Sequence, residues 1–122
     1  MSCARHRRRP EAAIQRGVFQ HLRARAAPGV FAFHVPNGGY RKPVEAAIMK
    51  GLGVVAGVPD VIVIHAGRCY ALELKRAGGR TTDNQRACLA ALREAGAITG
   101  VVDSIDAALT WLGTEGLLRG HV

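Results

Sequence analysis

The sequence is poor in aromatic residues and in cysteine, and it has no long apolar run. Aromatic residues make up 5% of the 122 positions, and the three cysteines, Cys3, Cys69 and Cys88, are too scattered for a disulfide framework or a C-x-x-C metal site. No segment approaches the roughly 20 apolar residues that a membrane-spanning helix needs. No apolar stretch follows the basic residues at the start, as it would in a secretory signal. These absences predict a reduced, cytoplasmic protein without a membrane segment.

Positive charge is in excess. Lysine and arginine total 17 against nine aspartates and glutamates, which gives a formal net charge of +8 at pH 7. A basic surface attracts polyanions through the release of counterions, so nucleic acid is a candidate partner, although many small basic domains bind none. Hydrophobic residues make up 48% of the chain, enough for one core, and 122 residues are too few for two. We expect a flexible basic arm over residues 1–9 and a single domain over residues 10–122.

Apolar periodicity and turn residues predict an α/β domain. Pro10 suits the first position of a helix, and Thr82 followed by Gln85 forms a capping box in front of another. The strand that ends at Lys75 is followed by a helix and a further strand, and such a crossover makes the two strands parallel. The expected result is a mixed sheet of about four strands flanked by helices, with helices at 11–25, 43–52, 83–95 and 104–112 and strands at 30–35, 60–64, 69–75 and 97–102.

A short hairpin brings three charged side chains together. With a two-residue turn between its strands, antiparallel pairing places Asp60 opposite Glu73, and strand alternation puts Lys75 on the same face as Glu73. Two opposed carboxylates repel each other unless a cation lies between them. Mg²⁺ suits this position because it prefers carboxylate and other oxygen ligands, and the peptide carbonyl of Leu74 offers a further oxygen.

The segments around these residues resemble a known nuclease signature. Gly57-Val58-Pro59-Asp60 followed by Glu73-Leu74-Lys75 is similar to the PD-(D/E)XK nuclease motif, and more specifically to the VRR-NUC family, the virus-type replication–repair nuclease domain. The resemblance covers most of the chain, and the other matching positions are Glu11, Pro36-Asn37-Gly38-Gly39, Gln85, Gly96 and Val101-Val102. It implies a restriction-endonuclease-like core in an intracellular protein of bacterial or phage-like type.

The resemblance also implies a reaction, namely hydrolysis of phosphodiester bonds in DNA with Mg²⁺ or Mn²⁺. Lys75 would position or deprotonate the attacking water, and Gln85 would orient Lys75 or a water. The residues that would bind the metal or its water are Asp60, Glu73, the carbonyl of Leu74 and Glu11.

Contacts to DNA are expected around this site. The glycine-rich turn with Asn37 and Gly38 can approach a phosphate closely, and it is equally compatible with a plain turn that has no ligand. Lys42, Arg76 and Arg80 carry charges that suit phosphate contacts and equally suit a solvated surface. Compact standalone relatives resemble junction-resolving enzymes that act as dimers, which implies branched or junction DNA as the substrate and a homodimer. A partner protein that supplies targeting is a further expectation.

Each of these residues also has a purely structural interpretation. Asp60 after a proline is typical of a turn, an E-x-K triplet is typical of an exposed edge strand, Glu11 suits the first turn of a helix, and Gln85 suits the cap. Two other functions remain open: a nucleic-acid-binding module with a non-catalytic nuclease-like fold, and a hydrolase of small phosphate esters or nucleotides. The convergence of two carboxylates and an ammonium on one face argues against the module, and the scarcity of aromatics argues against the hydrolase.

Overall fold

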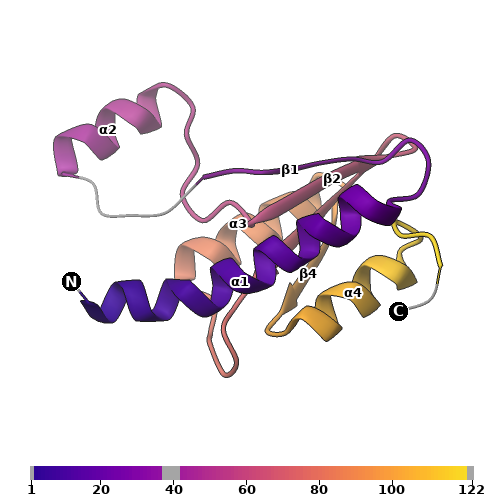
Figure 1. The fold of residues 1–122 in the computed structure, drawn as a ribbon. Helices are drawn as coiled ribbons and strands as arrows, with labels where there is room; N and C mark the ends of the chain where they lie inside the picture. Colours follow the sequence, from indigo (N-terminus) through magenta and orange to yellow (C-terminus); the bar gives the residue numbers. More distant parts are fainter. Residues whose placement is uncertain (1, 37–41, 121–122) are drawn as a thin grey trace.

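The computed structural model of the protein describes residues 2–36 and 42–120. Helices and strands follow one another in the order expected from the sequence (Figure 1). They are α1 (Ser2–Arg25), β1 (Phe31–His34), α2 (Pro43–Gly51), β2 (Val61–His65), β3 (Arg68–Leu74), α3 (Asp83–Glu94), β4 (Ile98–Val102) and α4 (Ile105–Thr114). Among the described residues, none of the helices combines the length and the apolar character that a membrane-spanning segment needs.

The strands form one mixed sheet in the order β1-β2-β3-β4. β1 and β3 both pair antiparallel with β2, whereas β4 pairs parallel with β3. The chain between β3 and β4 passes through α3, which is the crossover that parallel neighbours require. The predicted α/β class, with a mixed four-stranded sheet flanked by helices, is confirmed.

The hairpin between β2 and β3 has the expected register. His65 pairs with Arg68, so the turn consists of Ala66 and Gly67. Both turn residues have positive φ, 51° and 78°, which is the geometry of a type I′ turn whose twist matches that of the flanking strands. Because the side-chain period of a strand is two, this turn decides which residues of β2 and β3 share a face.

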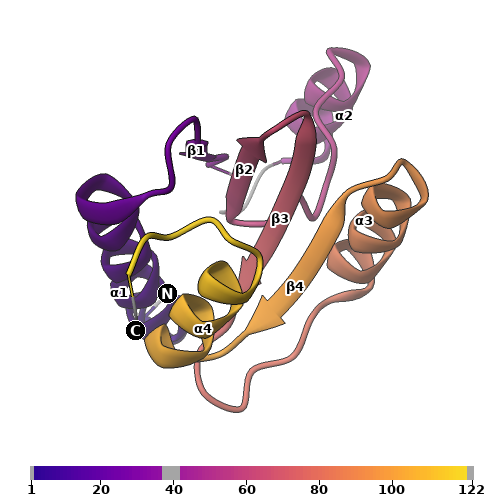
Figure 2. The same ribbon diagram turned by 90° about the vertical axis from the view of Figure 1, so that its right-hand side faces the viewer.

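The main core lies between the sheet and the helices α1 and α4, which cover the same face (Figure 1, Figure 2). Its buried side chains come from both helices and from alternate positions of β2 and β3: Val18, Leu22, Val61, Val63, Leu72, Leu74, Leu109 and Leu112. Alternation therefore turns Glu73 and Lys75 to the opposite face. α3 lies on that side of the sheet, next to β4 (Figure 2).

The helix α2 stands apart from the sheet and buries no residue (Figure 1). Val44 and Ile48 of α2 and Leu52, the residue that caps its C-terminus, follow one another at four-residue spacing, so they form one stripe. Their exposed fractions are 63%, 60% and 79%. No other element of the described chain covers this apolar stripe.

The start of α1 differs from the expectation. A helix was expected to begin at Pro10 after a flexible arm, but α1 begins at Ser2 and contains Pro10. Proline inside a helix removes one backbone donor and costs about 3 kcal/mol. It does not prohibit a helix where the neighbouring residues favour one, and the alanine and arginines that precede Pro10 are good helix formers.

Candidate active site

Two carboxylates meet at one end of the central hairpin. Val61 pairs with Leu72 in the β2–β3 register, so the next position outward sets Asp60 opposite Glu73. Asp60 immediately precedes β2, and Glu73 lies one residue before the end of β3. The register that the sequence predicted for this pair is thus present.

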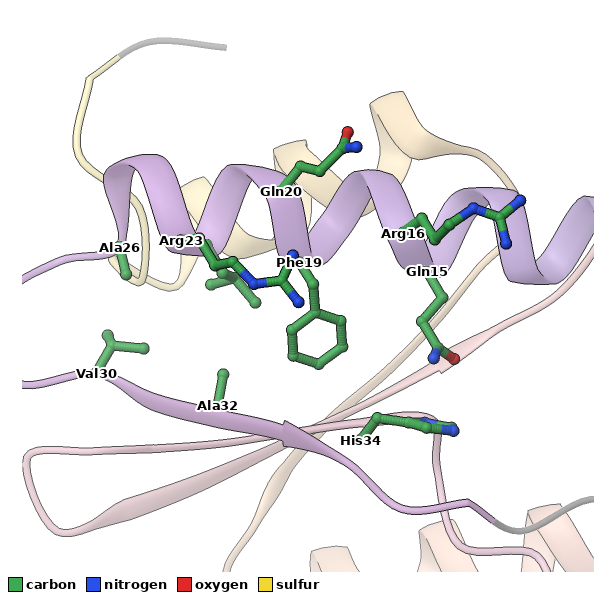
Figure 3. Close-up of a pocket in the computed structure, with 10 residues that line it drawn as sticks. Gln15, Arg16, Phe19, Gln20, Arg23, Ala26, Val30, Ala32 and His34 are labelled. Atoms are coloured by element: carbon green, nitrogen blue, oxygen red, sulfur yellow. The ribbon is translucent and has the colours of Figure 1, made fainter.

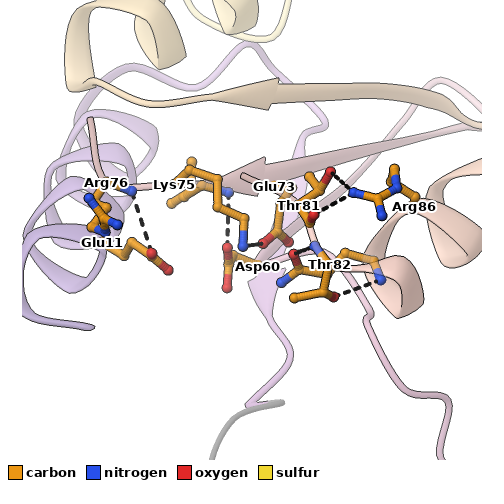
Figure 4. A network of polar contacts seen from close by, with 10 residues as sticks. Glu11, Asp60, Glu73, Lys75, Arg76, Thr81, Thr82 and Arg86 are labelled. Atoms are coloured by element: carbon orange, nitrogen blue, oxygen red, sulfur yellow. Dashed lines mark hydrogen bonds and ion pairs between the residues drawn. The ribbon is translucent and has the colours of Figure 1, made fainter. Parts of the chain in front are cut away.

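Hydrogen bonds and an ion pair fix the two carboxylates (Figure 4). The backbone N–H of Leu74 donates to Oδ2 of Asp60 at 2.9 Å. Nζ of Lys75 lies 3.3 Å from Oε2 of Glu73. Glu73 and Lys75 are only 2% and 7% exposed, so their charges are held away from bulk water. The interpretation of this triplet as an exposed face of an edge strand is therefore wrong, because β3 is a central strand and both side chains are buried.

The pKa values of both carboxyl groups are raised. At Glu73 burial is the largest cause and the negative charge of Asp60 adds to it, so that the pKa rises from its ordinary 4.5 to about 7 despite the neighbouring Lys75. Burial also raises the pKa of Asp60, against the lowering effects of the Leu74 N–H and of the charge of His34. The site therefore holds its negative charge at a cost in free energy, which a bound cation would offset.

The oxygen atoms present suit a hard cation. Leu74 directs its N–H toward Asp60, and in an extended strand the C=O of a residue lies on the same edge as its N–H. Within residues 2–36 and 42–120, no three or more His, Cys, Asp or Glu side chains are grouped to hold a metal ion. Two carboxylates and one carbonyl are nevertheless the kind of partial ligand set with which Mg²⁺ is bound, because Mg²⁺ keeps several waters and takes phosphate oxygens.

The first helix brings a further carboxylate to this end of the sheet. Oε2 of Glu11 accepts a long hydrogen bond, 3.4 Å, from the backbone N–H of Arg76. The negative charge of Glu11 also contributes to the raised pKa of Glu73. Glu11 is half-buried and points toward the same group of residues as Asp60 (Figure 4).

Gln85 takes part in the predicted capping box. Its side-chain oxygen accepts the N–H of Thr82 at 2.9 Å, while its own N–H donates to Oγ1 of Thr82 at 3.2 Å. The structural interpretation of Gln85 is thus confirmed. A role beside Lys75 stays a prediction: the ammonium of Lys75 can bond only to an acceptor, and the side-chain oxygen of Gln85 has a second lone pair beyond the one that the Thr82 N–H uses.

Gly57 explains why the loop before Asp60 can lie against α3. Its φ is +81°, and a Cβ atom at this position would come within 2.5 Å of the backbone of Asn84. Only glycine fits both constraints. The glycine of the G-x-P-D segment is thus a packing residue that sets the position of Asp60, a role that the sequence motif alone does not specify.

His34 is a residue of this site that the sequence analysis did not single out. Its Nδ1 lies 2.7 Å from the backbone oxygen of Asp60, and its charge lowers the pKa of the Asp60 carboxyl group. His34 ends β1 and pairs with Val61, so antiparallel pairing brings it next to Asp60. The register of the strands would have placed His34 beside Asp60, but it could be used only once β1 was known to pair with β2.

Of the residues predicted to contact DNA, the structure describes Lys42, Arg76 and Arg80. Asn37 and Gly38 lie outside the described residues. Arg76 and Arg80 are exposed in the loop that follows β3 and thus border the site, and the guanidinium of Arg76 donates to the carbonyl of Ala77 at 3.4 Å. Lys42 is exposed at the N-terminus of α2. Whether any of these groups contacts phosphate stays a prediction.

The fold can be compared with known proteins. No family model matches the sequence, and no curated protein matches it either. A solved structure described as "VRR_NUC domain protein" superimposes with a TM-score of 0.70 at 24% identity, covering 84% of each chain. Another, described as "VRR_NUC domain", gives a TM-score of 0.59 at 19% identity over 85% of this chain and 95% of the other.

The sheet, the flanking helices and these similarities define a class: the protein is an α/β domain with a restriction-endonuclease-like core. More specifically, it has the fold of the solved VRR_NUC domain structures. This confirms the fold that the sequence motifs implied.

The raised pKa of Glu73 predicts a pH dependence of stability in metal-free buffer. Between pH 4.5 and about 7 the folded protein retains a proton on Glu73 that the unfolded chain has lost, so the free energy of unfolding falls as the pH rises through this window. Below the window both states are protonated at this position, and above it both are ionised. We expect a decline on the order of 1–3 kcal/mol from this group.

Chemical denaturation across this pH range measures the decline. The native chain should show it, Glu73→Gln should lack this part of it, and Glu94→Gln, a change at an exposed position of α3, should leave it intact. Identical pH profiles for the native chain and Glu73→Gln would contradict the burial of the Glu73 charge.

Proposed function

We propose that this protein is a metal-dependent DNA endonuclease that hydrolyses phosphodiester bonds, with branched or junction DNA as its preferred substrate. One observation carries the proposal: Asp60 lies opposite the buried Glu73, and Lys75 lies 3.3 Å from Glu73, on a VRR-NUC fold. Opposed carboxylates with raised pKa values lower the stability of the fold, so a purely structural role does not account for them. They are useful at a site where a cation binds a phosphate.

The residues that would hold Mg²⁺ or Mn²⁺ are those at the end of the hairpin. Asp60 and Glu73 supply carboxylates and Leu74 its carbonyl, and water and phosphate oxygens complete the set. When bound, such a cation lowers the pKa of a coordinated water and stabilises negative charge on the phosphate. Glu11 would act from α1 on a water of this cation, because no three acidic side chains of the described residues are grouped closely enough to bind one ion together, whereas the charge of Glu11 does affect the pKa of Glu73.

The remaining polar groups would handle the attacking water. The ammonium of Lys75 is held by Glu73, where it would orient the water or take up its proton and offset the charge that develops on the scissile phosphate. Gln85 would assist by accepting from Lys75 with the second lone pair of its side-chain oxygen, or by donating an amide N–H to the water, since the helix cap uses only one lone pair of that oxygen. Hydrolysis forms a bond between the water oxygen and phosphorus and breaks one P–O ester bond, whose leaving oxygen takes up a proton, so one DNA end carries the phosphate and the other a hydroxyl group.

The DNA itself would be held by charges that border the site. Arg76 and Arg80 lie in the loop that follows β3, and the formal net charge of +8 favours a polyanion. Lys42, Asn37 and Gly38 are proposed phosphate contacts from the segment before α2, and a targeting partner protein remains part of the proposal. The free thiols of Cys69 and Cys88 suit a reducing compartment, and we place the reaction in the cytoplasm.

Substitution of Lys75 tests the reaction. Lys75→Ala should reduce cleavage by a factor of about 10² to 10⁴, because it removes the group that handles the proton, while binding to the same DNA in EDTA changes little. The measurement is cleavage of labelled duplex, nicked, flap and four-way junction DNA with Mg²⁺, Mn²⁺ or EDTA. Lys50→Ala removes an exposed lysine of α2 and serves as the control.

The outcomes separate the proposal from its alternative. Metal-dependent cutting that is lost in Lys75→Ala supports the nuclease. Tight DNA binding that needs no metal, together with no cutting of any substrate, would instead identify a nucleic-acid-binding module with a nuclease-like fold.

Substitution of Asp60 tests the metal site. Asp60→Asn should weaken Mn²⁺ binding by about tenfold or more, because the ligand loses its negative charge. Titration calorimetry without DNA gives the affinity, and Glu94→Gln is a matched control on an exposed carboxylate. Equal affinities of Asp60→Asn and the native chain would remove Asp60 from the ligand set.

We also propose that the chain forms a homodimer, which the recognition of branched DNA would favour. The support is the uncovered apolar stripe of Val44, Ile48 and Leu52 on α2. Sedimentation analysis should find a dimer for the native chain and a monomer for Ile48→Lys, with Glu45→Lys as a control beside the stripe. A native chain that sediments as a monomer at all concentrations would contradict this part of the proposal.

A further inference from the structure

A cleft lies between α1 and the edge strand β1 (Figure 3). Its volume is about 660 Å³, within the range of roughly 300–1,000 Å³ that is usual for ligand sites. Ala26, Val30 and Ala32 provide a small, apolar lining at one side. The mechanism proposed above does not use this cleft.

The side chains around the cleft combine positive charge with one aromatic ring. Arg16 and Arg23 are exposed at its rim, and neither guanidinium has a hydrogen bond or an ion pair within the described part of the chain. Phe19 points from α1 across the cleft toward β1 (Figure 3). No acidic residue is among the described residues that line the cleft. This lining suits a ligand that has negative charges and a flat apolar group.

The spacing of these groups fits a nucleic-acid strand. Arg16 and Arg23 lie on the same side of α1, two helical turns or about 10 Å apart along its axis, with Phe19 between them. This distance is longer than the axial rise of about 3.4 Å per nucleotide of one DNA strand. The two guanidinium groups can therefore reach phosphates of different nucleotides while a base stacks on the ring.

The cleft leads to the candidate active site. His34 lines it, and Nδ1 of the same side chain lies 2.7 Å from the backbone oxygen of Asp60. Gln15 also lines it, one helical turn beyond Glu11, whose carboxylate accepts the N–H of Arg76. A strand that lies in the cleft would therefore continue toward the Asp60 and Glu73 carboxylates.

We propose that the α1–β1 cleft binds an unpaired segment of DNA next to the scissile phosphate, with phosphates at Arg16 and Arg23 and a base against Phe19. A cleft of this volume accepts a few nucleotides at most and excludes a double helix. The inference rests on the proposed nuclease function and adds to it a need for unpaired DNA beside the cut, as occurs at a flap or at an opened junction.

Binding of a short labelled oligothymidine in EDTA tests the cleft without catalysis. Fluorescence anisotropy should show that Arg16→Ala/Arg23→Ala weakens binding by about tenfold or more and reduces the slope of log affinity against log salt by about 1.4, the value for two phosphate contacts on a single strand. Phe19→Leu keeps an apolar side chain in the half-buried position but removes the stacking surface, and it should weaken binding by about fivefold or more. Arg68→Ala removes one exposed charge at the start of β3, away from the cleft, and should change binding by less than about twofold.

The inference would be overturned if the double arginine variant and Phe19→Leu bound the oligonucleotide as tightly as Arg68→Ala. It would also be overturned if thymidine monophosphate displaced the oligonucleotide fully at equal nucleotide concentration, because the cleft would then be a site for free nucleotides. If Phe19→Leu failed to fold, the double arginine variant would still test whether the cleft binds DNA, since both of its positions are exposed.

A cleavage experiment separates this inference from the proposed function. Junction and flap substrates with and without an unpaired tail are compared in Mn²⁺, and the native chain should cut the tailed forms faster, a preference that the double arginine variant loses. If Lys75→Ala loses cutting while the double arginine variant retains the preference for tailed substrates, the nuclease function is supported and the binding of unpaired DNA in the cleft is rejected. If binding depends on the cleft arginines but no substrate is cut, the nuclease function is rejected and the binding of unpaired DNA in the cleft is supported.

Discussion

Glu73 is a carboxylate buried on a central strand, opposite Asp60, and much of the remaining structure serves to keep it there. Leu72 and Leu74 on either side of it are fully buried in the core under α1 and α4, so the strand cannot rotate without exposing them. The N–H of Lys75 donates to the carbonyl of Val102 at 2.8 Å, which ties the same segment to β4. The position of the charged face is therefore set by the packing of the apolar face, because successive side chains of a strand alternate.

Segments far apart in the chain complete the site around this pair. α1 supplies Glu11, β1 supplies His34 through its pairing with β2, and α3 supports the loop that carries Asp60. Each of these contacts by itself contributes little to the free energy of folding. Together they place three carboxylates and one ammonium at one end of the sheet, where burial raises the pKa of Glu73 and of Asp60. The free energy that this arrangement costs in the absence of a cation suits a site that binds one.

The surface divides into regions of different character. The α1–β1 cleft carries arginines and leads to the carboxylates, whereas the stripe on α2 is apolar and uncovered. The loop after β3 adds Arg76 and Arg80. In the proposed function the first and third regions hold the DNA strand on two sides of the cut, and the second pairs two copies of the chain so that both can act on one branched molecule.

Much of the fold could be predicted because its signals are local. Apolar periodicity, the capping box at Thr82 and the two-residue turn at Ala66-Gly67 gave the element order and the hairpin register, with ends within about two residues apart from α1. The start of α1 was misjudged because proline disfavours a helix interior only by a finite free energy, which the neighbouring residues can outweigh. The pairing of Asp60 with Glu73 followed from counting residues along the hairpin.

What the sequence by itself determined was therefore the set of elements, the opposed carboxylates and the face that Lys75 shares with Glu73, since these depend on neighbours along the chain or across one tight turn. Only the tertiary structure decided that Glu73 and Lys75 are buried, that His34 reaches the backbone of Asp60, that Gly57 admits the backbone of α3, and that Phe19 faces β1 across a cleft. The physical reason is that burial and long-range contact depend on which surfaces pack together. That choice is made by the whole core at once and leaves no periodic trace in the sequence around any one of these residues.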